Sequence, residues 1–293
     1  MNFLQNAIDA ISLGAVYALA ALGIGLIFSI MRLINFAHGE LIMAGGFTLY
    51  SLVGQPLLVL ILAALIVTSI LALGMERVAF RPLRKANPAT LLIASFAVSY
   101  FVQHVVLMLY GSRAMGVPFL AELATSVEFG GLRVPRLQIV TIVVTLLLMG
   151  GLVAFFRLSR IGLQMRAAAE DFNMARLVGV KANRVIAFAF AISGVLACMV
   201  SFYLVAQTGS VSYKMGVSMV LIAFVSSVVG GMGSIAGAAL GGFLVGIISV
   251  SLQAYLPVEL RPYRDAFVFL IFILFLFWRP EGLLKSRADR ERV

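Results

Sequence analysis

The side chains best suited to chemistry lie in one polar stretch between two apolar segments. Asn35, Phe36, His38, Gly39 and Glu40 bring an amide, an imidazole and a carboxylate close together, and Gly39 relaxes the backbone. Ionisable groups are costly at membrane depth, so this cluster predicts a functional site. An ordinary short loop at the membrane interface is the alternative interpretation of the same residues.

Catalytic patterns around the candidate residues are incomplete. His38 and Glu40 form the H-x-E pair of zinc deaminases, but no P-C-x-x-C follows, and Cys198 is the only cysteine. Ser193 and Ser234 lie next to glycines but lack the flanking glycine pair of an intramembrane serine protease. The phosphate-binding pattern G-x-x-x-x-G-K-[ST] is absent as well. We therefore expect no enzyme, no metal site and no cofactor, and any ATP must be bound and hydrolysed by another subunit.

Composition places these residues in an integral membrane protein. The chain has 293 residues, of which 62% are hydrophobic and 12% charged, with a mean hydropathy of +1.08. The long apolar runs predict spanning helices, since a barrel would show short alternating strands. The net charge of +10 comes from basic residues in short loops beside the spans and gives no indication of nucleic-acid binding. We expect no cleavable signal peptide, because the first apolar run is too long.

The predicted fold is all-α and polytopic, a single transmembrane domain over 1–293 with eight or nine helices. The expected spans are 8–30, 41–54, 57–73, 89–110, 137–156, 185–206, 216–229, 238–254 and 265–278. The short span 41–54, which opens with Gly45-Gly46, looks like a broken helix near a translocation path. His104 is alone in an apolar span and is interpreted as structural.

Small residues predict two further features of the spans. Gly14, Ala18, Ala21 and Gly25 form one face of the first span, suited to close helix packing. Four glycines between the seventh and eighth spans allow sharp chain reversal and are candidate hinge positions, with a re-entrant segment as the alternative: Gly230, Gly231, Gly233 and Gly237.

The basic loops predict the orientation. The loop 76–88 and the segment 157–184 are rich in Arg and Lys, so both should be cytoplasmic. The loop 111–136 has a weaker basic bias and is placed outside, where Val127-Glu128-Phe129 predicts one strand of a small hairpin. Alternating sides give an external N-terminus and a cytoplasmic C-terminus with a basic tail.

The segment 157–184 also contains a predicted helix with two apolar faces. Five residues recur at spacings of three and four: Ile161, Met165, Ala168, Phe172 and Ala175. Met174 and Leu177 point off this stripe, and Gly179 is a helix stop. Such a helix suits contact with the membrane domain on one side and a partner on the other. The spacing is equally consistent with an interfacial helix lying on anionic lipid.

Four stretches in this order resemble the branched-chain amino acid permeases of ABC importers. They are Asn35 to Glu40, the R-A-A-A-E-D motif with the following Ala175, Leu177 and Gly179, the glycine run Gly230 to Gly237, and Tyr263-Arg264-Asp265 through Arg279-Pro280-Glu281-Gly282. The resemblance covers nearly the whole chain. The chain length favours the smaller, high-affinity permease subunit of a binding-protein-dependent importer.

The resemblance implies partners and roles. Expected partners are a second and different permease chain, two cytoplasmic ABC ATPase subunits, a periplasmic binding protein and the lipid of the bacterial inner membrane. Residues implied to dock onto the ATPase are Arg166, Ala168, Ala169, Glu170, Asp171, Met174, Ala175, Leu177 and Gly179. Residues expected to line the translocation pathway are Asn35, Phe36, His38, Gly39, Glu40, Ser226 and Ser227.

Several alternatives stay open at this stage. His38 either bonds substrate or holds a chain break through a backbone carbonyl, and Glu40 could cap the following helix. Ser226 and Ser227 could bond back to the preceding turn instead of lining the path. Related permeases handle urea, amides or aromatic acids. Alternative functions of a different class are a stand-alone carrier, a channel or a structural scaffold. The second permease could also be another copy of this chain.

Overall fold

The computed structural model describes residues 2–84, 86–120, 123, 125–129 and 132–284. Residues 130–131 and Glu122 of the loop 111–136 and the basic tail 285–293 lie outside the described residues. The helices of the bundle are α1 (Asn2–Met31), α2 (His38–Ser51), α3 (Leu57–Met75), α4 (Pro88–Tyr110), α5 (Arg136–Leu158), α8 (Ala182–Thr208), α9 (Met215–Gly230), α10 (Ile235–Tyr255) and α11 (Arg264–Trp278). Each predicted span therefore corresponds to one helix.

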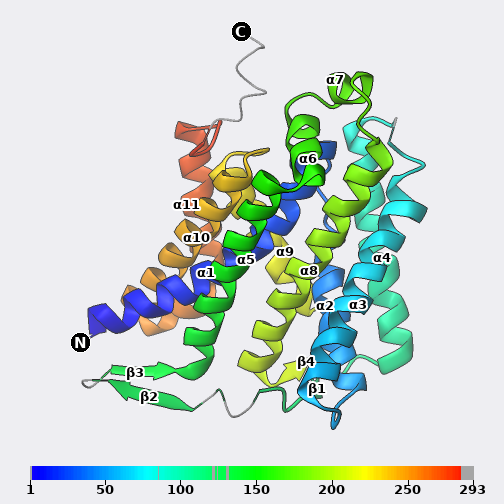
Figure 1. Ribbon diagram of the computed structural model, residues 1–293. Helices are drawn as coiled ribbons and strands as arrows, with labels where there is room; N and C mark the ends of the chain where they lie inside the picture. The colour runs from blue at the N-terminus through cyan, green and yellow to red at the C-terminus, as the bar shows by residue number, and fades with distance from the viewer. Residues whose placement is uncertain (1, 85, 121–122, 124, 130–131, 285–293) are drawn as a thin grey trace.

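The other elements gather at the two ends of the bundle (Figure 1). At one end lie the π-helical turn η1 (Glu76–Phe80) and the short helices α6 (Arg160–Glu170) and α7 (Phe172–Leu177). The opposite end carries the 3-10 turn η3 (Val258–Tyr263) and four short strands: β1 (Met115–Gly116), β2 (Ser126–Phe129), β3 (Leu132–Pro135) and β4 (Ser210–Val211). The predicted hairpin is confirmed, because β2 and β3 pair antiparallel with Val127 opposite Val134.

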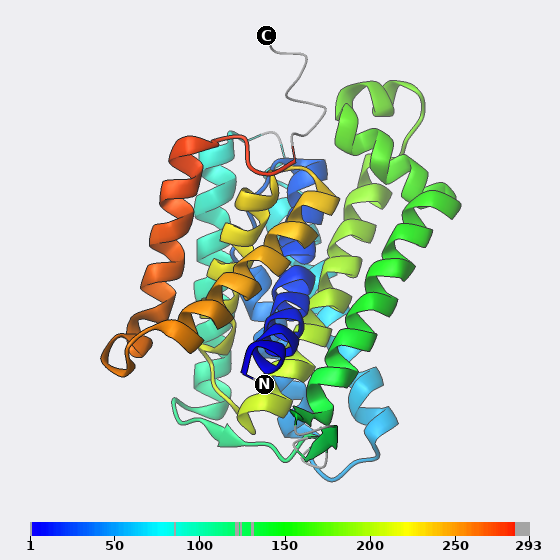
Figure 2. The same ribbon diagram turned by 90° about the vertical axis from the view of Figure 1, so that its left-hand side faces the viewer.

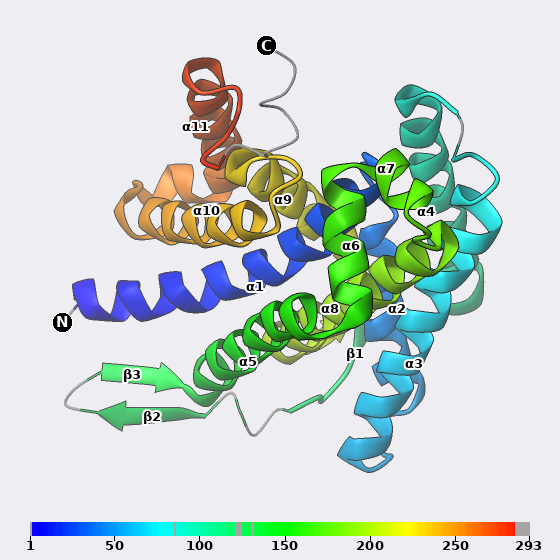
Figure 3. The ribbon, with the colours of Figure 1, turned by 45° about the horizontal axis from the view of Figure 1, so that its top comes forward.

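Helix length and burial separate the core of the bundle from its rim. Six helices are long and apolar enough to cross a membrane: α1, α3 with η1, α4, α5, α8 and α10; α9 is a shorter apolar helix. The most apolar stretch of α1 is 83% buried, against 17% in α3, α4 and α5. Figure 3 shows α1 lying between α10 and the pair α5 and α8. The first helix is therefore the centre of the fold.

Small residues explain why α1 can lie at the centre. A Cβ placed on Gly242 would lie 2.4 Å from the Cα of Ala18, and one on Gly246 would lie 2.2 Å from the Cα of Gly14. The backbones of α1 and α10 therefore approach more closely than ordinary side chains would permit. The packing face predicted from Gly14 and Ala18 is confirmed.

The chain break that the sequence suggested lies before α2 and not within it. Residues 32–37 are non-helical, and Arg32 has a φ of +54°. Gly45 and Gly46 lie inside a continuous helix, so the prediction of a break there is wrong. They serve close packing instead, since a Cβ on Gly45 would lie 2.6 Å from the Ser201 hydroxyl. Gly237 likewise lies in the first turn of α10 and not in the preceding reversal.

Two short helices begin inside the bundle and cross there. The six residues 32–37 lead from α1 to α2, and residues 209–214 lead from α8 to α9. The two helices run in opposite directions (Figure 1). They meet at Gly39 and Gly216, where a Cβ on Gly216 would lie 1.9 Å from the Gly39 carbonyl oxygen. Short helices that begin inside a membrane bundle after a non-helical segment are common beside transport pathways.

Candidate functional site

The turn that leads into α2 is organised by Asn35. Its side-chain oxygen accepts from the Ala37 amide at 3.1 Å, and its carbonyl accepts from the His38 amide at 3.2 Å. These bonds form a tight local turn from which α2 starts, as is common for asparagine. Asn35 is fully buried, and within the described chain its Nδ2 has no hydrogen-bond partner.

His38 connects α2 to α1 and α8. The ring is fully buried, and its Nδ1 lies 2.9 Å from the Ser193 hydroxyl. A Cβ on Gly23 would lie 2.4 Å from the ring, so the absence of a side chain there makes room for the histidine. The expected bond to a backbone carbonyl is wrong, because the partner is a hydroxyl on another helix. The enclosed ring supports the structural interpretation of His38.

Glu40 connects α2 to α4. The residue is only 1% exposed, and its Oε1 accepts from the Ser99 hydroxyl and from Gln103 Nε2, each at 2.7 Å. Glu40 is the acidic residue in the first turn of α2, where the helix dipole favours a carboxylate, although the N-cap Ala37 makes no side-chain cap bond. Its carboxylate lies at the helix N-terminus but is bonded across to the neighbouring helix.

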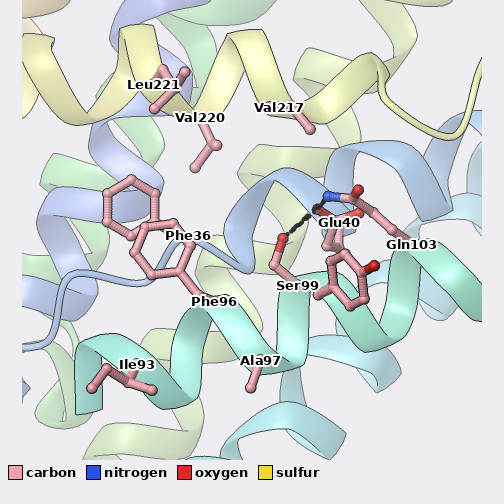
Figure 4. A pocket seen from close by; sticks show the side chains of 11 residues that line it. Phe36, Glu40, Ile93, Phe96, Ala97, Ser99, Gln103, Val217, Val220 and Leu221 are labelled. Atoms are coloured by element: carbon pink, nitrogen blue, oxygen red, sulfur yellow. Dashed lines mark hydrogen bonds between the residues drawn. The ribbon is translucent and has the colours of Figure 1, made fainter. Parts of the chain in front are cut away.

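A cavity of about 500 Å³ lies beside Glu40, between α2, α4 and α9 (Figure 4). Glu40, Ser99 and Gln103 form its polar end, next to Val217 in the first turn of α9. Phe36 and Phe96 form the apolar end, with ring centroids 4.4 Å apart in a stacked arrangement. Pockets of this size, with apolar walls and a few placed polar groups, are typical of small-molecule sites.

The structure separates the predicted pathway residues into two groups. Phe36 and Glu40 line the cavity, and Gly39 lies beside it at the crossing with α9. Ser226 and Ser227 are buried further along α9, where Ser227 approaches Gly25 of α1. The alternative that Ser226 bonds back to the preceding turn is wrong, since its hydroxyl has no partner within the described residues. A pathway role for these two serines stays a prediction.

The predicted docking segment forms two helices and not one. Asp171 is extended at φ −144° and caps α7, accepting from the Asn173 and Met174 amides at 2.9 and 3.0 Å. Aspartate favours this position because its side chain satisfies amides that a helix start leaves unpaired. The expectation of one continuous helix is therefore wrong. Gly179 ends the segment with a φ of +91°, as predicted.

The two faces of this segment differ as the spacing predicted. Met165, Ala168 and Ala175 are buried, and α6 packs against α1, α5 and α8 (Figure 3). Met174 is 62% exposed and Leu177 81%, on the outer face with Val178. The remaining predicted docking residues divide in the same way: Ala169 is half-buried, whereas Arg166, Glu170 and Asp171 are exposed. Met174, Leu177 and Val178 therefore form an apolar knob that projects from the end of the bundle.

Comparison with known proteins decides the family. The family model described as "Branched-chain amino acid transport system / permease component" matches residues 6–276. The high-affinity branched-chain amino acid transport system permease protein BraD of Pseudomonas aeruginosa is 37% identical, covering 100% of this chain and 98% of the relative. The LivH permease proteins of Salmonella typhimurium and Escherichia coli are each 34% identical, with the same two coverages.

The chain belongs to the branched-chain amino acid permease family. The resemblance drawn from the four motifs is thereby confirmed. A more distant relative, a probable branched-chain amino acid transport permease protein LivH of Methanocaldococcus jannaschii, is 26% identical over 81% of the chain. The protein is thus a multi-pass membrane permease whose relatives are components of a transport system.

The glycine run of this permease is held by its C-terminal motif. A Cβ on Gly230 would lie 1.9 Å from the Gly237 carbonyl oxygen, so α9 and α10 join in a very close turn. The amides of Leu283 and Leu284 donate to the Val229 and Gly230 carbonyls at 2.8 and 3.0 Å. Gly231 and Gly233 have φ values of +109° and +92°. The segment after Arg279-Pro280-Glu281-Gly282 thus pairs with the turn, and a hinge role for the glycines stays a prediction.

Sequence reasoning missed the contribution of α4 to the site. Ser95, Ser99 and Gln103 recur at every fourth position of an apolar span and so share one face. Ser95 accepts from the Phe36 amide at 3.4 Å, and the other two bond Glu40. This polar stripe is the feature of the sequence from which the contribution of α4 could have been predicted. His104 lies off it and bonds the Tyr100 carbonyl at 2.8 Å, in agreement with a structural role.

Proposed function

We propose that this chain is a transmembrane permease subunit of an ATP-driven importer for branched-chain or related amino acids. The proposal takes its substrate class from relatives named as permease proteins of high-affinity branched-chain amino acid transport systems. A chain without a P-loop pattern needs a separate ATPase. We infer two cytoplasmic ATPase subunits, a second permease, which we take to be a different chain, and a periplasmic binding protein.

The observation that carries the proposal is the apolar knob on α7. Met174 and Leu177 of α7 and the following Val178 are strongly exposed where α7 projects beyond the bundle, and no other part of the chain that the structure describes covers them. Exposed apolar groups on a structured helix mark a protein interaction site. We assign this surface to the ATPase, so that its movements pass through α6 to α1, α5 and α8.

The translocation pathway is assigned to the face that contains the cavity. The cavity opens between α4 and α9, where Tyr100 and Phe96 on its rim are exposed. A polar end bordered by Glu40 is poorly suited to acyl chains. We therefore place the second permease against α4 and α9, so that the two chains enclose the path.

Sidedness follows from the same assignment. The N-terminus and the β2–β3 hairpin lie at the end opposite α6 and α7 (Figures 1 and 2). With the ATPase on α7, that opposite end is external, where the binding protein docks, and α11 ends on the cytoplasmic side. The basic residues of 76–88 and 157–184 agree with this orientation in the bacterial inner membrane.

Co-purification tests the proposed function. The chain is expressed with its neighbouring transport genes, solubilised gently and isolated by a tag, and an ATPase and a second permease are expected with it. The double variant Met174→Asp, Leu177→Asp should lose the ATPase but stay in the membrane, because it places charge in the apolar contact. Asn173→Asp is the control, since it adds one negative charge beside the knob without removing apolar surface.

Two results would contradict the proposal. One is full retention of the ATPase by the double variant. The other is a chain that purifies alone and moves solute across vesicle membranes without ATP, which would make it a carrier or channel. Uptake of urea, amides or aromatic acids instead of leucine by the assembled complex would correct the substrate class only.

A further inference from the structure

One oxygen of Glu40 is free to bind a donor inside the cavity. Ser99 and Gln103 both donate to Oε1, each at 2.7 Å, and Oε2 has no hydrogen bond within the described chain. Ion pairs join Arg84 to Glu76 and Arg264 to Asp265, but no described Arg, Lys or His pairs with Glu40. A carboxylate buried without a cation is costly. The cavity is therefore complementary to a cationic donor.

The same end of the cavity also suits an anion. Helix α9 begins at Met215, and Val217 in its first turn lies beside Glu40 and Gln103 (Figure 4). The N-cap, Lys214, makes no side-chain cap bond. The amides of Met215 and Val217 donate to the Ser212 and Lys214 carbonyls, each at 3.1 Å, so it is the helix dipole that favours a carboxylate at this position. A cation site and an anion site thus lie at one end of one cavity.

The other end of the cavity accepts only apolar groups. The Phe36 ring stacks on Phe96 with centroids 4.4 Å apart and is tilted against Phe224 with centroids 5.5 Å apart. Val220 and Leu221 complete the wall. Polar side chains of the lining are gathered at the Glu40 end in Figure 4. A ligand that fits carries an ammonium and a carboxylate together and an apolar side chain away from them.

We infer that this cavity is a binding station for an α-amino acid with an apolar side chain. The ammonium is held by Glu40 Oε2, the carboxylate by the first turn of α9, and the side chain lies between Phe36 and Leu221. Ser99 and Gln103 are positioning residues that orient Glu40. The inference rests on the proposed function and deepens it, because it excludes ligands without an ammonium group, such as urea or aromatic acids, from this station.

Photolabelling of the assembled importer tests the station. A leucine analogue with a diazirine in its side chain is added to the complex in lipid, irradiated, and the labelled residues are located by mass spectrometry. Label is expected on α4 and α9 around Phe96 and Leu221. Glu40→Gln should reduce it by about tenfold or more, the effect of losing one charge-assisted hydrogen bond. Leucine should compete, whereas the 2-oxo acid with the same side chain should not.

A control separates the station from a general effect of neutralising a hydrogen-bonded carboxylate. Asp9 Oδ1 also accepts from two side chains, Gln5 at 3.3 Å and Gln138 at 2.8 Å, but lies outside the cavity. Asp9→Asn should leave labelling unchanged. If Glu40→Gln does not assemble, Leu221→Trp is used, because this 40% exposed residue can fill the cavity without touching the Glu40 bonds.

The outcomes distinguish the inference from the proposed function. ATP-dependent leucine uptake is measured on the same preparation. Three results would each overturn the station but leave the proposed importer function intact. They are uptake without label in the cavity, label unchanged by Glu40→Gln or Leu221→Trp, and competition by the 2-oxo acid. Absence of leucine uptake by the unaltered complex would overturn the proposed function itself, and the station with it.

Discussion

Three residues of the polar stretch near α2 have different roles. Asn35 sets the turn, His38 holds α2 to α8 through Ser193, and Glu40 faces the cavity with its free oxygen. Adjacent positions of a helix start point to different sides, so residues two apart in the sequence serve a structural and a ligand-facing role. Their closeness in the sequence therefore does not make them one catalytic group.

The His38 contact predicts a loss of stability. Ser193→Ala removes the one hydrogen bond that the fully buried His38 ring makes within the described residues, and leaving such a group unpaired costs about 1–3 kcal/mol. The thermal unfolding midpoint of the purified complex should fall. Ser51→Ala is the control, because its hydroxyl contacts Tyr110 in an exposed position. An unchanged midpoint for Ser193→Ala would contradict the structural role of His38.

The residue scale also shows what the sequence could predict of the site. Asn35 to Glu40 stood out because polar groups between apolar runs need a reason to be there. The partners Ser99 and Gln103 are about sixty residues away along the chain, with separations of 59 and 63. Only packing of α4 against α2 brings them to the carboxylate. Local spacing in the sequence therefore could not predict the hydrogen bonds of Glu40.

At the scale of elements, hydropathy predicted each spanning helix but placed the breaks wrongly. Gly45 and Gly46 were interpreted as a break, yet α2 continues through them because the missing side chains admit Ser201 and Met215. Glycine allows both irregular backbone and close approach, and only the neighbours decide which is used. The split between α6 and α7 has a similar origin, since Asp171 fits a helical pattern but caps a new helix.

The Asp171 cap predicts how the docking knob depends on α7. A six-residue helix is unstable on its own, so the cap contributes an appreciable share of its stability, about 1 kcal/mol. Asp171→Ala should raise amide hydrogen exchange over residues 172–178 and reduce the co-purified ATPase. Asp171→Asn keeps the cap and should behave normally. Loss of the ATPase in Asp171→Asn as well would assign the effect to charge.

At the scale of the whole molecule, the helices form two sets that run in opposite directions. A long helix, a short helix that begins inside the bundle and two further helices occur as α1 to α4 and again as α8 to α11. The two short helices, α2 and α9, meet at Gly39 and Gly216 beside the cavity. An inverted repeat of this kind is hard to detect by sequence comparison, because it keeps the order of the helices, with their direction reversed, and not residue identity.

The orientation of the molecule in the membrane can be tested at both of its ends, on the β2–β3 hairpin and on α7. In a Cys198→Ala background, cysteine is introduced singly by Ser126→Cys on the hairpin and by Asn173→Cys on α7, both exposed positions. A membrane-impermeant maleimide applied to intact spheroplasts should label the hairpin variant at once and the α7 variant only after permeabilisation. Cys198 is fully buried, so the unaltered chain should stay unlabelled and serve as the background control. Labelling of the α7 variant from outside would place the knob where no ATPase can reach it, and the assignment of this surface would be wrong.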